Sequence, residues 1–562
     1  MLANYKRWLE SPNTDPDLKK QLATMSEKQI NDAFYTNIEF GTAGMRGVMA
    51  PGSNRINIHT IRKANVGFAE YIVENGQEAC AQGVAISYDN RYMSKEFAMD
   101  SAKILASYNI KSYVFESLRP TPELSFAVRY LNCFGGIMIT ASHNPKEYNG
   151  YKLYDKNGCQ LVPALASRVI AKVNAITDEL SINPSLTKEQ EQLISIIGKE
   201  VDDAYLEAVM QIRLRKNVNK DLKIVFSPEH GASNLLVQAA FKAGGYDYIL
   251  VKEQATFDPA FSNTASPNPE NLHAYDLALE YAKKNDADII LVCDPDGDRM
   301  GVGVKHKNDY VIMTGNQSGA VLLEYILSTR QALKTLPTNA VMFNTVVTSD
   351  LGEKVASKYR VATEKTLTGF KFIGEKVAKY EINHEKTYVF GYEESYGSLI
   401  SPFVRDKDAT QACLLLAEAA AYYKENGKDL VDVLNDLYQE HGAYNEEQVA
   451  IVLKGQEGAD KIKAIIANLR ANPLENIADT KVVAIEDYQT LKRYANDTVT
   501  DLKGFTKAEV LKYFLADGSW IAIRPSGTEP KIKIYFCVKA ATMALCHEKT
   551  AKYKLAMQVY TQ

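Results

Sequence analysis

Helical stretches that alternate with short apolar runs constrain the fold of this 562-residue chain more than any other feature. The apolar runs at 84–88, 111–115 and 136–139 are separated by stretches of helical character. Strands that alternate with helices form a mostly parallel sheet with helices on both faces. The same order of apolar run, polar loop with Gly, and helix restarts near residue 223 and near residue 340. We therefore predict three related α/β domains with mixed, mostly parallel sheets.

The last part of the chain has a different pattern. Two runs, 517–524 and 531–538, alternate polar and apolar residues and are joined by a polar connection. This pattern predicts an antiparallel hairpin and not a crossover unit, so we expect a smaller C-terminal α+β domain. Boundaries near residues 205, 320 and 445 divide the chain into four predicted domains, 1–205, 206–320, 321–445 and 446–562.

Charge and composition exclude several classes of partner. Lys and Arg total 65 and Asp and Glu total 69, so the net charge of −4 favours neither nucleic acid nor an anionic membrane surface. We find no apolar run of about 18 residues and no apolar core of a secretory signal at the N-terminus. The seven cysteines form no CxxC pair, which predicts buried thiols in a reducing compartment. We expect a cytoplasmic protein that acts on a small molecule, without nucleic acid or membrane partners.

The most informative loop follows the apolar run 136–139 and reads ITASHNPKEYNGYK. It delivers a hydroxyl (Ser142), an imidazole (His143) and an amide to the end of a predicted strand, with Lys152 ten residues after the serine. Packing a core does not require this order of residues. The pattern indicates a nucleophile or a phosphate carrier at the edge of a sheet.

A second loop carries three carboxylates at alternate positions, Asp294, Asp296 and Asp298, directly after a buried apolar run. Alternate side chains of an extended loop can converge, and oxygen ligands of this kind suit Mg²⁺. A Ca²⁺ loop would need Glu at its twelfth position, where this chain has Lys305. An acidic surface turn is the plain alternative, but three clustered carboxylates without a cation repel one another. We predict a metal site.

A third loop lies between the two C-terminal runs and reads RPSGTEPK from residue 524. Its guanidinium, two hydroxyls and glycine N–H could surround the oxygens of a phosphate. An ordinary hairpin loop with satisfied Ser and Thr side chains explains the same letters equally well.

Weaker loops complete the pattern. Carboxylates and a hydroxyl in GYEESYG, 391–397, could accept hydrogen bonds from sugar hydroxyls. The Gly-rich segment 41–47 carries Arg46 but lacks the spacing of a nucleotide P-loop. Two further polar loops, taken singly, are typical of plain protein surface: 365–371 and 405–408.

Taken together and in order, these loops resemble the signature loops of the α-D-phosphohexomutase superfamily, from Gly41 to Tyr535. Within it the chain is most similar to the α-phosphoglucomutases. The resemblance implies four domains around a central cleft, in a monomer or dimer, with one Mg²⁺ per chain. It also implies an isomerase that interconverts α-D-glucose 1-phosphate and glucose 6-phosphate. Such an enzyme uses a phosphoserine and glucose 1,6-bisphosphate, which serves as both intermediate and activator.

The resemblance also implies a role for each loop residue. Ser142 carries the phosphoryl group, and Lys152 is the general acid and base, with His143 and Arg46 assisting. The metal is held by Ser142, Asp294, Asp296 and Asp298, and Arg299 is a further residue of that loop. The sugar hydroxyls bind to Glu393 and Ser395. The substrate cleft is lined by Thr368, Gly369, Arg405 and Lys407. The non-reacting phosphate is bound by Arg524, Ser526, Gly527 and Thr528.

These residues suit phosphoryl transfer better than hydrolysis. No Asp–His pair is evident to activate Ser142, a difficulty that is reduced if the resting enzyme already holds phosphoserine. A lysine base needs a lowered pKa, which we expect from neighbouring cations. Three alternatives remain open at this point: a phosphatase, a phosphopentomutase or phosphomannomutase with the same chemistry, and a non-catalytic sugar-phosphate sensor.

Overall fold

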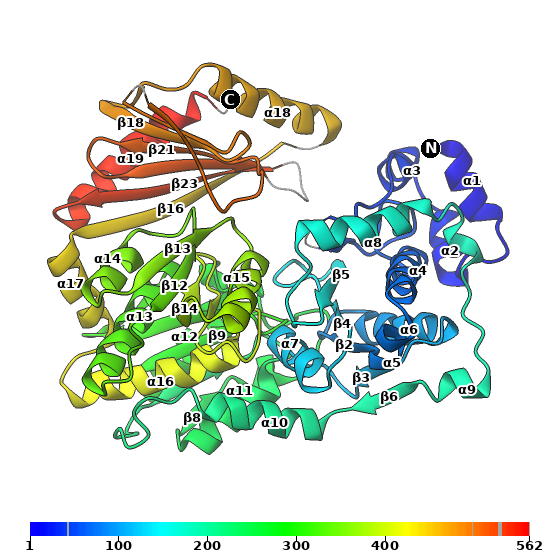
Figure 1. Ribbon diagram of the computed structural model, residues 1–562, viewed down its shortest axis with the longest axis horizontal. Helices are drawn as coiled ribbons and strands as arrows, with labels where there is room; N and C mark the ends of the chain where they lie inside the picture. The colour runs from blue at the N-terminus through cyan, green and yellow to red at the C-terminus, as the bar shows by residue number, and fades with distance from the viewer. Residues whose placement is uncertain (42–43, 454, 497, 526–530, 561–562) are drawn as a thin grey trace. The chain divides into compact units, whose positions relative to one another are not determined.

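The computed structural model describes residues 1–41, 44–453, 455–496, 498–525 and 531–560 (Figure 1). The chain forms two compact units. The first unit comprises Met1–Gly315 and Phe370–Asp429, and the second comprises Asn316–Gly369 and Leu430–Gln562. Among the described residues, no helix is both long and apolar enough to cross a membrane. The central cleft stays a prediction.

Three helices open the first unit: α1 (Leu2–Glu10), α2 (Pro16–Leu22) and α3 (Glu27–Phe34). Asp15 caps α2 by accepting from the backbone N–H groups of Asp17 and Leu18. A capping box between Ser26 and Gln29 starts α3. Trp8, which is fully buried, packs edge-on against Phe34 and joins α1 to α3.

The first sheet of this unit has six strands in the order β1-β5-β4-β2-β3-β6. Its parallel part consists of β4 (Gly135–Ile139), β2 (Val84–Tyr88), β3 (Ser112–Phe115) and β6 (Ile194–Ile197). Two strands run antiparallel to their neighbours, β1 (Met45–Val48) and β5 (Tyr148–Asp155). The strands that we predicted from the apolar runs are confirmed to within one residue.

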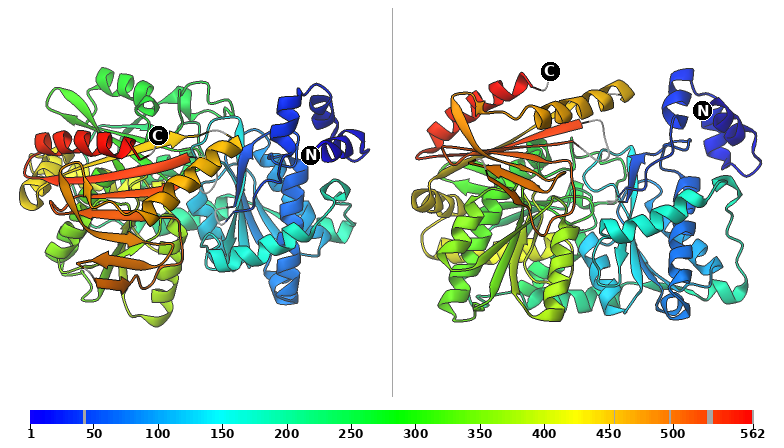
Figure 2. Two further views of the ribbon diagram at one scale, coloured as in Figure 1. Left: turned by 90° about the horizontal axis from the view of Figure 1, so that it is seen from above. Right: turned by 45° about the horizontal axis from the view of Figure 1, so that its top comes forward.

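Helices cover both faces of this sheet because alternate strand residues point to opposite sides. One core contains Val84, Ile86 and Ile137 with side chains of α4 (Ile58–Glu74), α6 (Ser94–Ser107) and α8 (Pro163–Ala175). The other contains Ala85 and Met138 with side chains of α7 (Thr121–Tyr130) and α10 (Lys199–Met210). The remaining helices here are short: α5 (Gln77–Gln82), η1 (Glu179–Ser181) and α9 (Lys188–Glu191). Figure 2 shows these layers from two further directions.

The second sheet of the unit has the order β11-β10-β9-β7-β8. Its strands are β7 (Ile224–Ser227), β8 (Tyr248–Leu250), β9 (Ile289–Cys293), β10 (Met300–His306) and β11 (Asp309–Met313). β8 and β9 pair parallel with β7, whereas β10 pairs antiparallel with β9 and β11. The helices are α11 (Asn234–Gly244), η2 (Lys252–Ala255), η3 (Leu272–Tyr275) and α12 (Asp276–Asn285). The predicted metal loop is the connection from β9 to β10.

The last part of the first unit carries the antiparallel pair β14 (Thr387–Tyr392) and β15 (Ser398–Leu399). Two helices flank this pair in sequence, α15 (Phe370–Asn383) and α16 (Ala409–Glu425). The loop between β14 and β15 is the predicted sugar-recognition loop.

The second unit contains the parallel pair β12 (Ala340–Thr345) and β13 (Ala362–Thr366). Three helices accompany it: α13 (Gly315–Ala332), α14 (Leu351–Lys358) and α17 (Leu430–His441). Its C-terminal part is an antiparallel sheet in the order β16-β23-β22-β21-β18-β19-β20, with β17 (Asn476–Ile477) pairing with β18. The other strands are β16 (Ala443–Val452), β18 (Thr480–Asp487), β19 (Lys492–Ala495), β20 (Thr498–Asp501), β21 (Leu511–Leu515), β22 (Trp520–Pro525) and β23 (Lys531–Ala540).

Two helices, α18 (Gly455–Ala471) and α19 (Met543–Gln558), contribute to the core of this C-terminal sheet. The predicted hairpin is confirmed, because β22 and β23 pair antiparallel from Trp520↔Cys537 to Pro525↔Ile532. Three α/β domains with mixed sheets and a β-rich C-terminal domain agree with the predicted fold class.

Candidate active site

Ser142 lies in a strained and buried position just after β4. Its φ of 54° is in the left-handed region, and only 2% of the residue is exposed. A non-glycine residue held in this way carries strain that is concentrated at functional sites. The Ser142 N–H donates to the Oγ1 atom of Thr140 at 2.7 Å. Its own Oγ lies 3.2 Å from Nδ1 of His143 and 3.5 Å from Oδ2 of Asp294.

Asp294, Asp296 and Asp298 form a buried carboxylate cluster in the loop from β9 to β10. Each offers one carboxylate oxygen, and these atoms lie within 4.8 Å of one another. The Oδ1 atoms of Asp296 and Asp298 are buried and have no hydrogen-bond partner among the described residues. Burying such oxygens without a partner is costly. Three hard oxygen donors with unused lone pairs fit a divalent cation such as Mg²⁺.

The pKa values of Asp294 and Asp296 are shifted in opposite directions. Burial, together with the carboxylates of Asp298 and Asp296, raises the pKa of Asp294 well above its usual value. Burial would also raise the pKa of Asp296, but the charges of Lys152, Lys407 and Arg299 together outweigh burial and hold this pKa below its usual value. The cluster therefore needs positive charge, and Lys152, Lys407 and Arg299 already supply part of it.

Lys152 projects from β5, where it pairs with Met138 of β4. Its Nζ donates to Oδ2 of Asp296 at 2.8 Å, and Thr121 Oγ1 donates to the same oxygen at 3.1 Å. We expected cations around this lysine, but its hydrogen-bond acceptor is a carboxylate. The strand pairing explains how a residue from the end of the serine loop reaches the aspartate cluster.

Arg46 reaches the serine loop from the neighbouring strand. β1 pairs with β5 so that Arg46 lies opposite Gly150. Its Nη1 donates to Oδ1 of Asn144 at 3.0 Å. The guanidinium is thus held beside the residues that follow Ser142.

Lys407 joins the aspartate loop to the loop between β14 and β15. Its Nζ lies 3.2 Å from Asp298, 3.7 Å from Glu393 and 3.5 Å from Asp406. Burial would lower the pKa of Lys407, but these carboxylates raise it above its usual value. Gly397 is required beside it, because a Cβ there would lie 1.9 Å from Cδ of Lys407. Glu393 is buried, whereas Ser395 on the same loop is partly exposed.

The two remaining predicted site arginines of the first unit, Arg299 and Arg405, differ in their surroundings. Arg299 Nη1 contacts Glu270 at 2.7 Å, and its Nε lies 3.7 Å from Asp294 and 3.6 Å from Asp298. Arg405 was expected to line a cleft, and that role stays a prediction. Its side chain is 0% exposed and pairs with Glu381, so it braces α15.

The predicted residues of the second unit are described separately. Thr368 and Gly369 follow β13, and the Oγ1 atom of Thr368 is buried without a hydrogen-bond partner among the described residues. Arg524 lies near the end of β22, opposite Lys533 of β23. Ser526, Gly527 and Thr528 lie outside the described residues.

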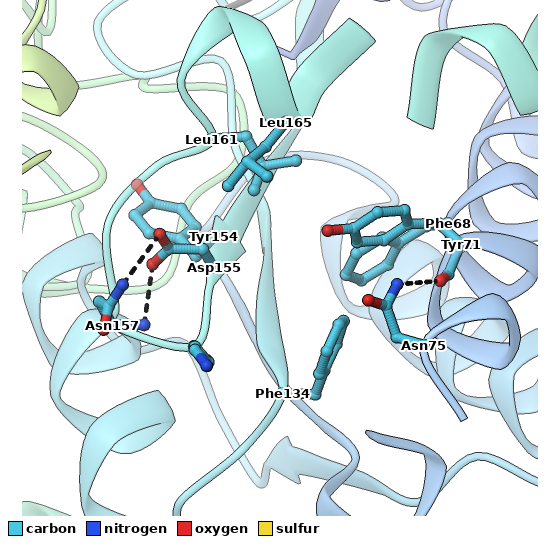
Figure 3. Close-up of a pocket in the computed structure, with 10 residues that line it drawn as sticks. Phe68, Tyr71, Asn75, Phe134, Tyr154, Asp155, Asn157, Leu161 and Leu165 are labelled. Atoms are coloured by element: carbon cyan, nitrogen blue, oxygen red, sulfur yellow. Dashed lines mark hydrogen bonds between the residues drawn. The ribbon is translucent and has the colours of Figure 1, made fainter. Parts of the chain in front are cut away.

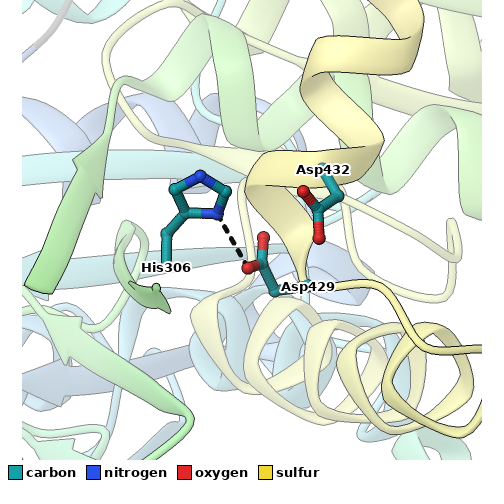
Figure 4. A group of neighbouring side chains, drawn as sticks. All are labelled: His306, Asp429 and Asp432. Atoms are coloured by element: carbon teal, nitrogen blue, oxygen red, sulfur yellow. Dashed lines mark hydrogen bonds and ion pairs between the residues drawn. The ribbon is translucent and has the colours of Figure 1, made fainter. Parts of the chain in front are cut away.

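A cavity and a cluster of charged side chains involve none of the predicted catalytic residues. A cavity of about 250 Å³ is lined by aromatic and aliphatic side chains, including Phe68, Tyr71 and Phe134, with Asn75 and Asn157 also in its wall (Figure 3). His306 on β10 contacts Oδ2 of Asp429 through Nδ1 at 2.8 Å (Figure 4).

Sequence analysis did not identify Asp89 and Arg91, although both touch the serine loop. Arg91 Nη2 donates to the carbonyl oxygen of Ser142 at 2.6 Å, and Asp89 accepts from Thr140 at 2.7 Å. They follow β2, the parallel neighbour of β4. Because the carboxyl ends of adjacent parallel strands meet at one edge, the charged pair after run 84–88 was a usable signal.

Models of a known protein family match most of this chain. Three models described as phosphoglucomutase/phosphomannomutase, alpha/beta/alpha domains I, II and III, match residues 37–180, 203–307 and 314–441. A fourth, the C-terminal domain of the same family, matches residues 459–548. The chain belongs to the phosphoglucomutase/phosphomannomutase family.

Similar family members are known in sequence and in structure. A protein of Staphylococcus epidermidis named phosphoglucomutase is 39% identical over 91% of this chain and 92% of its own length. One from Staphylococcus aureus with the same name is 38% identical over 95% of both chains. The crystal structure of the Paramecium phosphoglucomutase parafusin covers 93% of this chain and 95% of its own, with a TM-score of 0.66 and 19% identity. That likeness supports the fold.

Proposed function

We propose that this chain is a phosphoglucomutase that interconverts α-D-glucose 1-phosphate and glucose 6-phosphate through phosphoserine at Ser142 and glucose 1,6-bisphosphate. One observation carries the proposal. The Oγ of a strained, buried serine lies 3.5 Å from a carboxylate of a three-aspartate cluster. Relatives at 38–39% identity that are named phosphoglucomutase support the choice of sugar.

A phosphate on Ser142 would add up to two negative charges beside three buried carboxylates. Asp294, Asp296 and Asp298 would hold one Mg²⁺ together with this phosphate, which fits the buried Oδ1 atoms of Asp296 and Asp298 that have no hydrogen-bond partner among the described residues. When bound, the cation would offset the charge of the transferring phosphoryl group. Lys152, Lys407 and Arg299 contribute the protein's own positive charge to the same loop.

Lys152 is the proposed proton carrier because its Nζ is held at the aspartate cluster by Asp296. In the forward step the neutral amine form of Lys152 takes the proton of a sugar hydroxyl, whose oxygen forms a bond to phosphorus while the bond from phosphorus to Ser142 Oγ breaks. Lys152 then passes the proton to the freed Ser142 oxygen. Turnover of the bisphosphate and the reverse transfer restore phosphoserine and release the isomer. Arg46 and His143 assist by holding the serine loop and its charge.

Substrate recognition is assigned by residue. Glu393 and Ser395 are proposed to bind sugar hydroxyls, with Lys407 holding Glu393 in place. The non-reacting phosphate is assigned to the loop with Arg524, Ser526, Gly527 and Thr528, and the loop with Thr368 and Gly369 also contacts substrate. We further propose domain boundaries near 205, 320 and 445, a cytoplasmic location, and a monomer or dimer, which light scattering would distinguish.

A coupled assay tests this function. With Mg²⁺ and a trace of glucose 1,6-bisphosphate, glucose 6-phosphate formed from glucose 1-phosphate is oxidised by its dehydrogenase and followed by absorbance. Ser142→Ala should abolish turnover. A higher kcat/KM for mannose or ribose 1-phosphate would assign another sugar, and phosphate release faster than isomerisation would indicate a phosphatase.

A further inference from the structure

Arg91 is fully buried and holds the serine loop through backbone atoms. Its Nη2 donates to the carbonyl oxygens of Ser142 at 2.6 Å and Asn144 at 2.5 Å. Its Nη1 donates to those of Pro145 at 2.8 Å and Tyr148 at 3.1 Å. One guanidinium therefore contacts four carbonyl groups between residues 142 and 148.

Asp89 holds Arg91 and the start of the same loop. Its Oδ2 accepts from Nε of Arg91 at 3.1 Å, and both side chains are 0% exposed. The same Oδ2 accepts from Oγ1 of Thr140 at 2.7 Å, and that hydroxyl in turn accepts from the N–H of Ser142 at 2.7 Å. A continuous chain of hydrogen bonds thus runs from the buried ion pair to the strained backbone of Ser142.

The segment that carries this pair also binds the far end of the serine loop. Asn149 is fully buried, and its Nδ2 donates to the carbonyl oxygen of Tyr92 and to Oγ of Ser94, both at 3.0 Å. Ser94 Oγ donates to Oδ1 of Asp89 at 2.9 Å. Residues 89–94 therefore bind both ends of the loop 142–149.

We infer that the Asp89–Arg91 pair is a positioning device for phosphoryl transfer, which keeps Ser142 in its left-handed conformation facing Asp294. This inference rests on the proposed function for its catalytic meaning. Arg91 can hold four carbonyl groups at once because its guanidinium presents five donors in a rigid planar fork. A buried ion pair is a poor source of stability, so its value here is the unique geometry that it imposes on four carbonyls.

Arg91→Lys tests this directly, because lysine keeps a cation beside Asp89 but has no planar fork. Arg62→Lys is the matched control, since Arg62 likewise binds Asp100 at 2.8 and 2.9 Å and the carbonyl oxygen of Ile182 at 3.0 Å. We expect kcat of Arg91→Lys to fall about 10²-fold, because a misplacement of about 1 Å has that effect. KM should change little, since the sugar-binding loops are untouched. Hydrogen exchange of residues 142–149 should become faster in Arg91→Lys and stay unchanged in Arg62→Lys.

A second pair of variants covers the case in which Arg91→Lys fails to fold. Thr140→Val removes the hydroxyl that links Asp89 to the Ser142 N–H, and Thr140→Ser keeps it. We expect Thr140→Val to lower kcat and speed exchange of the loop, and Thr140→Ser to resemble the unmodified protein. Equal behaviour of the two Thr140 variants would overturn the inference.

The two readouts separate this inference from the proposed function. If the unmodified protein shows no mutase activity but Arg91→Lys still speeds exchange of residues 142–149, the proposed function fails and the positioning role stands. If the unmodified protein is active and Arg91→Lys changes neither kcat nor exchange, the positioning role is wrong and the function stands.

Discussion

Glu229 offers a sharp test of how burial controls charge next to the aspartate loop. It follows β7, is 0% exposed, and has a φ of 47°. Its Oε2 atom has no hydrogen-bond partner among the described residues. The same loop contacts the aspartate loop, because the N–H of Ala232 donates to the carbonyl oxygen of Pro295 at 2.8 Å. Burial raises the pKa of Glu229 to about 8, so we expect this carboxyl to be mostly protonated at neutral pH.

The sign and size of the effect follow from proton linkage. The folded-state pKa of about 8 lies above the ordinary value of 4.5, so the folded protein holds an extra proton between these pH values. The stability carried by that proton is present in full below pH 4.5 and is lost as the pH rises through about 8. The difference corresponds to about 5 kcal/mol. Glu229→Gln, which cannot ionise, should not lose this stability at alkaline pH.

Melting temperatures at pH 5 and pH 8.5 measure the effect. At pH 5 the variant and the unmodified protein should melt at similar temperatures. At pH 8.5 the variant should melt higher, by roughly 5 °C. Glu280→Gln is the control, because Glu280 is exposed on α12 and should give no pH-dependent difference. A Glu229→Gln variant that melts below the unmodified protein at pH 8.5 would refute this account of Glu229.

Three further perturbations test the site. Lys152→Met should lower kcat by about 10²–10⁴-fold in the coupled assay, because the proton carrier is gone; retention of most of the turnover would exclude that role. Gly397→Ala places a Cβ 1.9 Å from Cδ of Lys407, so it should destabilise the protein by about 1–3 kcal/mol in thermal unfolding. The destabilisation caused by Gly397→Ala should be smaller when Lys407 is also replaced by Ala. Strictly additive effects of the two substitutions would contradict a clash between these residues. EDTA should abolish turnover and added Mg²⁺ should restore it, whereas activity that survives EDTA would contradict the metal assignment.

The sequence was sufficient to predict elements that are buried on both faces. The runs that became β2 and β4 are continuous apolar segments, and each strand is buried throughout. β5 was not predicted, because Asn149, Gly150 and Lys152 make its segment resemble a polar loop. Long-range pairing with β4 and β1 stabilises it as a strand, and such pairing has no local signature.

The site also contains residues that the local sequence predicts and residues that it does not. The aspartate cluster could be predicted because its chemistry lies in three side chains of one short loop. The loop with Arg405, taken singly, is typical of plain surface, because the partner Glu381 lies 24 residues earlier and is not evident from the local sequence. Arg91 was missed because four of its acceptors are backbone carbonyls, which every residue possesses. The sequence could have placed this charged pair at the edge of the sheet, but the structure was needed to show which backbone carbonyls Arg91 binds.

The central claim is that Ser142 carries the phosphoryl group and passes it to the sugar. The most direct measurement is to label the protein with glucose 1,6-bisphosphate, map the phosphorylated peptide by mass spectrometry, and follow the loss of label on adding glucose 6-phosphate. We predict phosphate on Ser142 alone, transferred to the sugar at least as fast as kcat. Phosphate on another residue, or a label that leaves Ser142 more slowly than turnover, would contradict the claim.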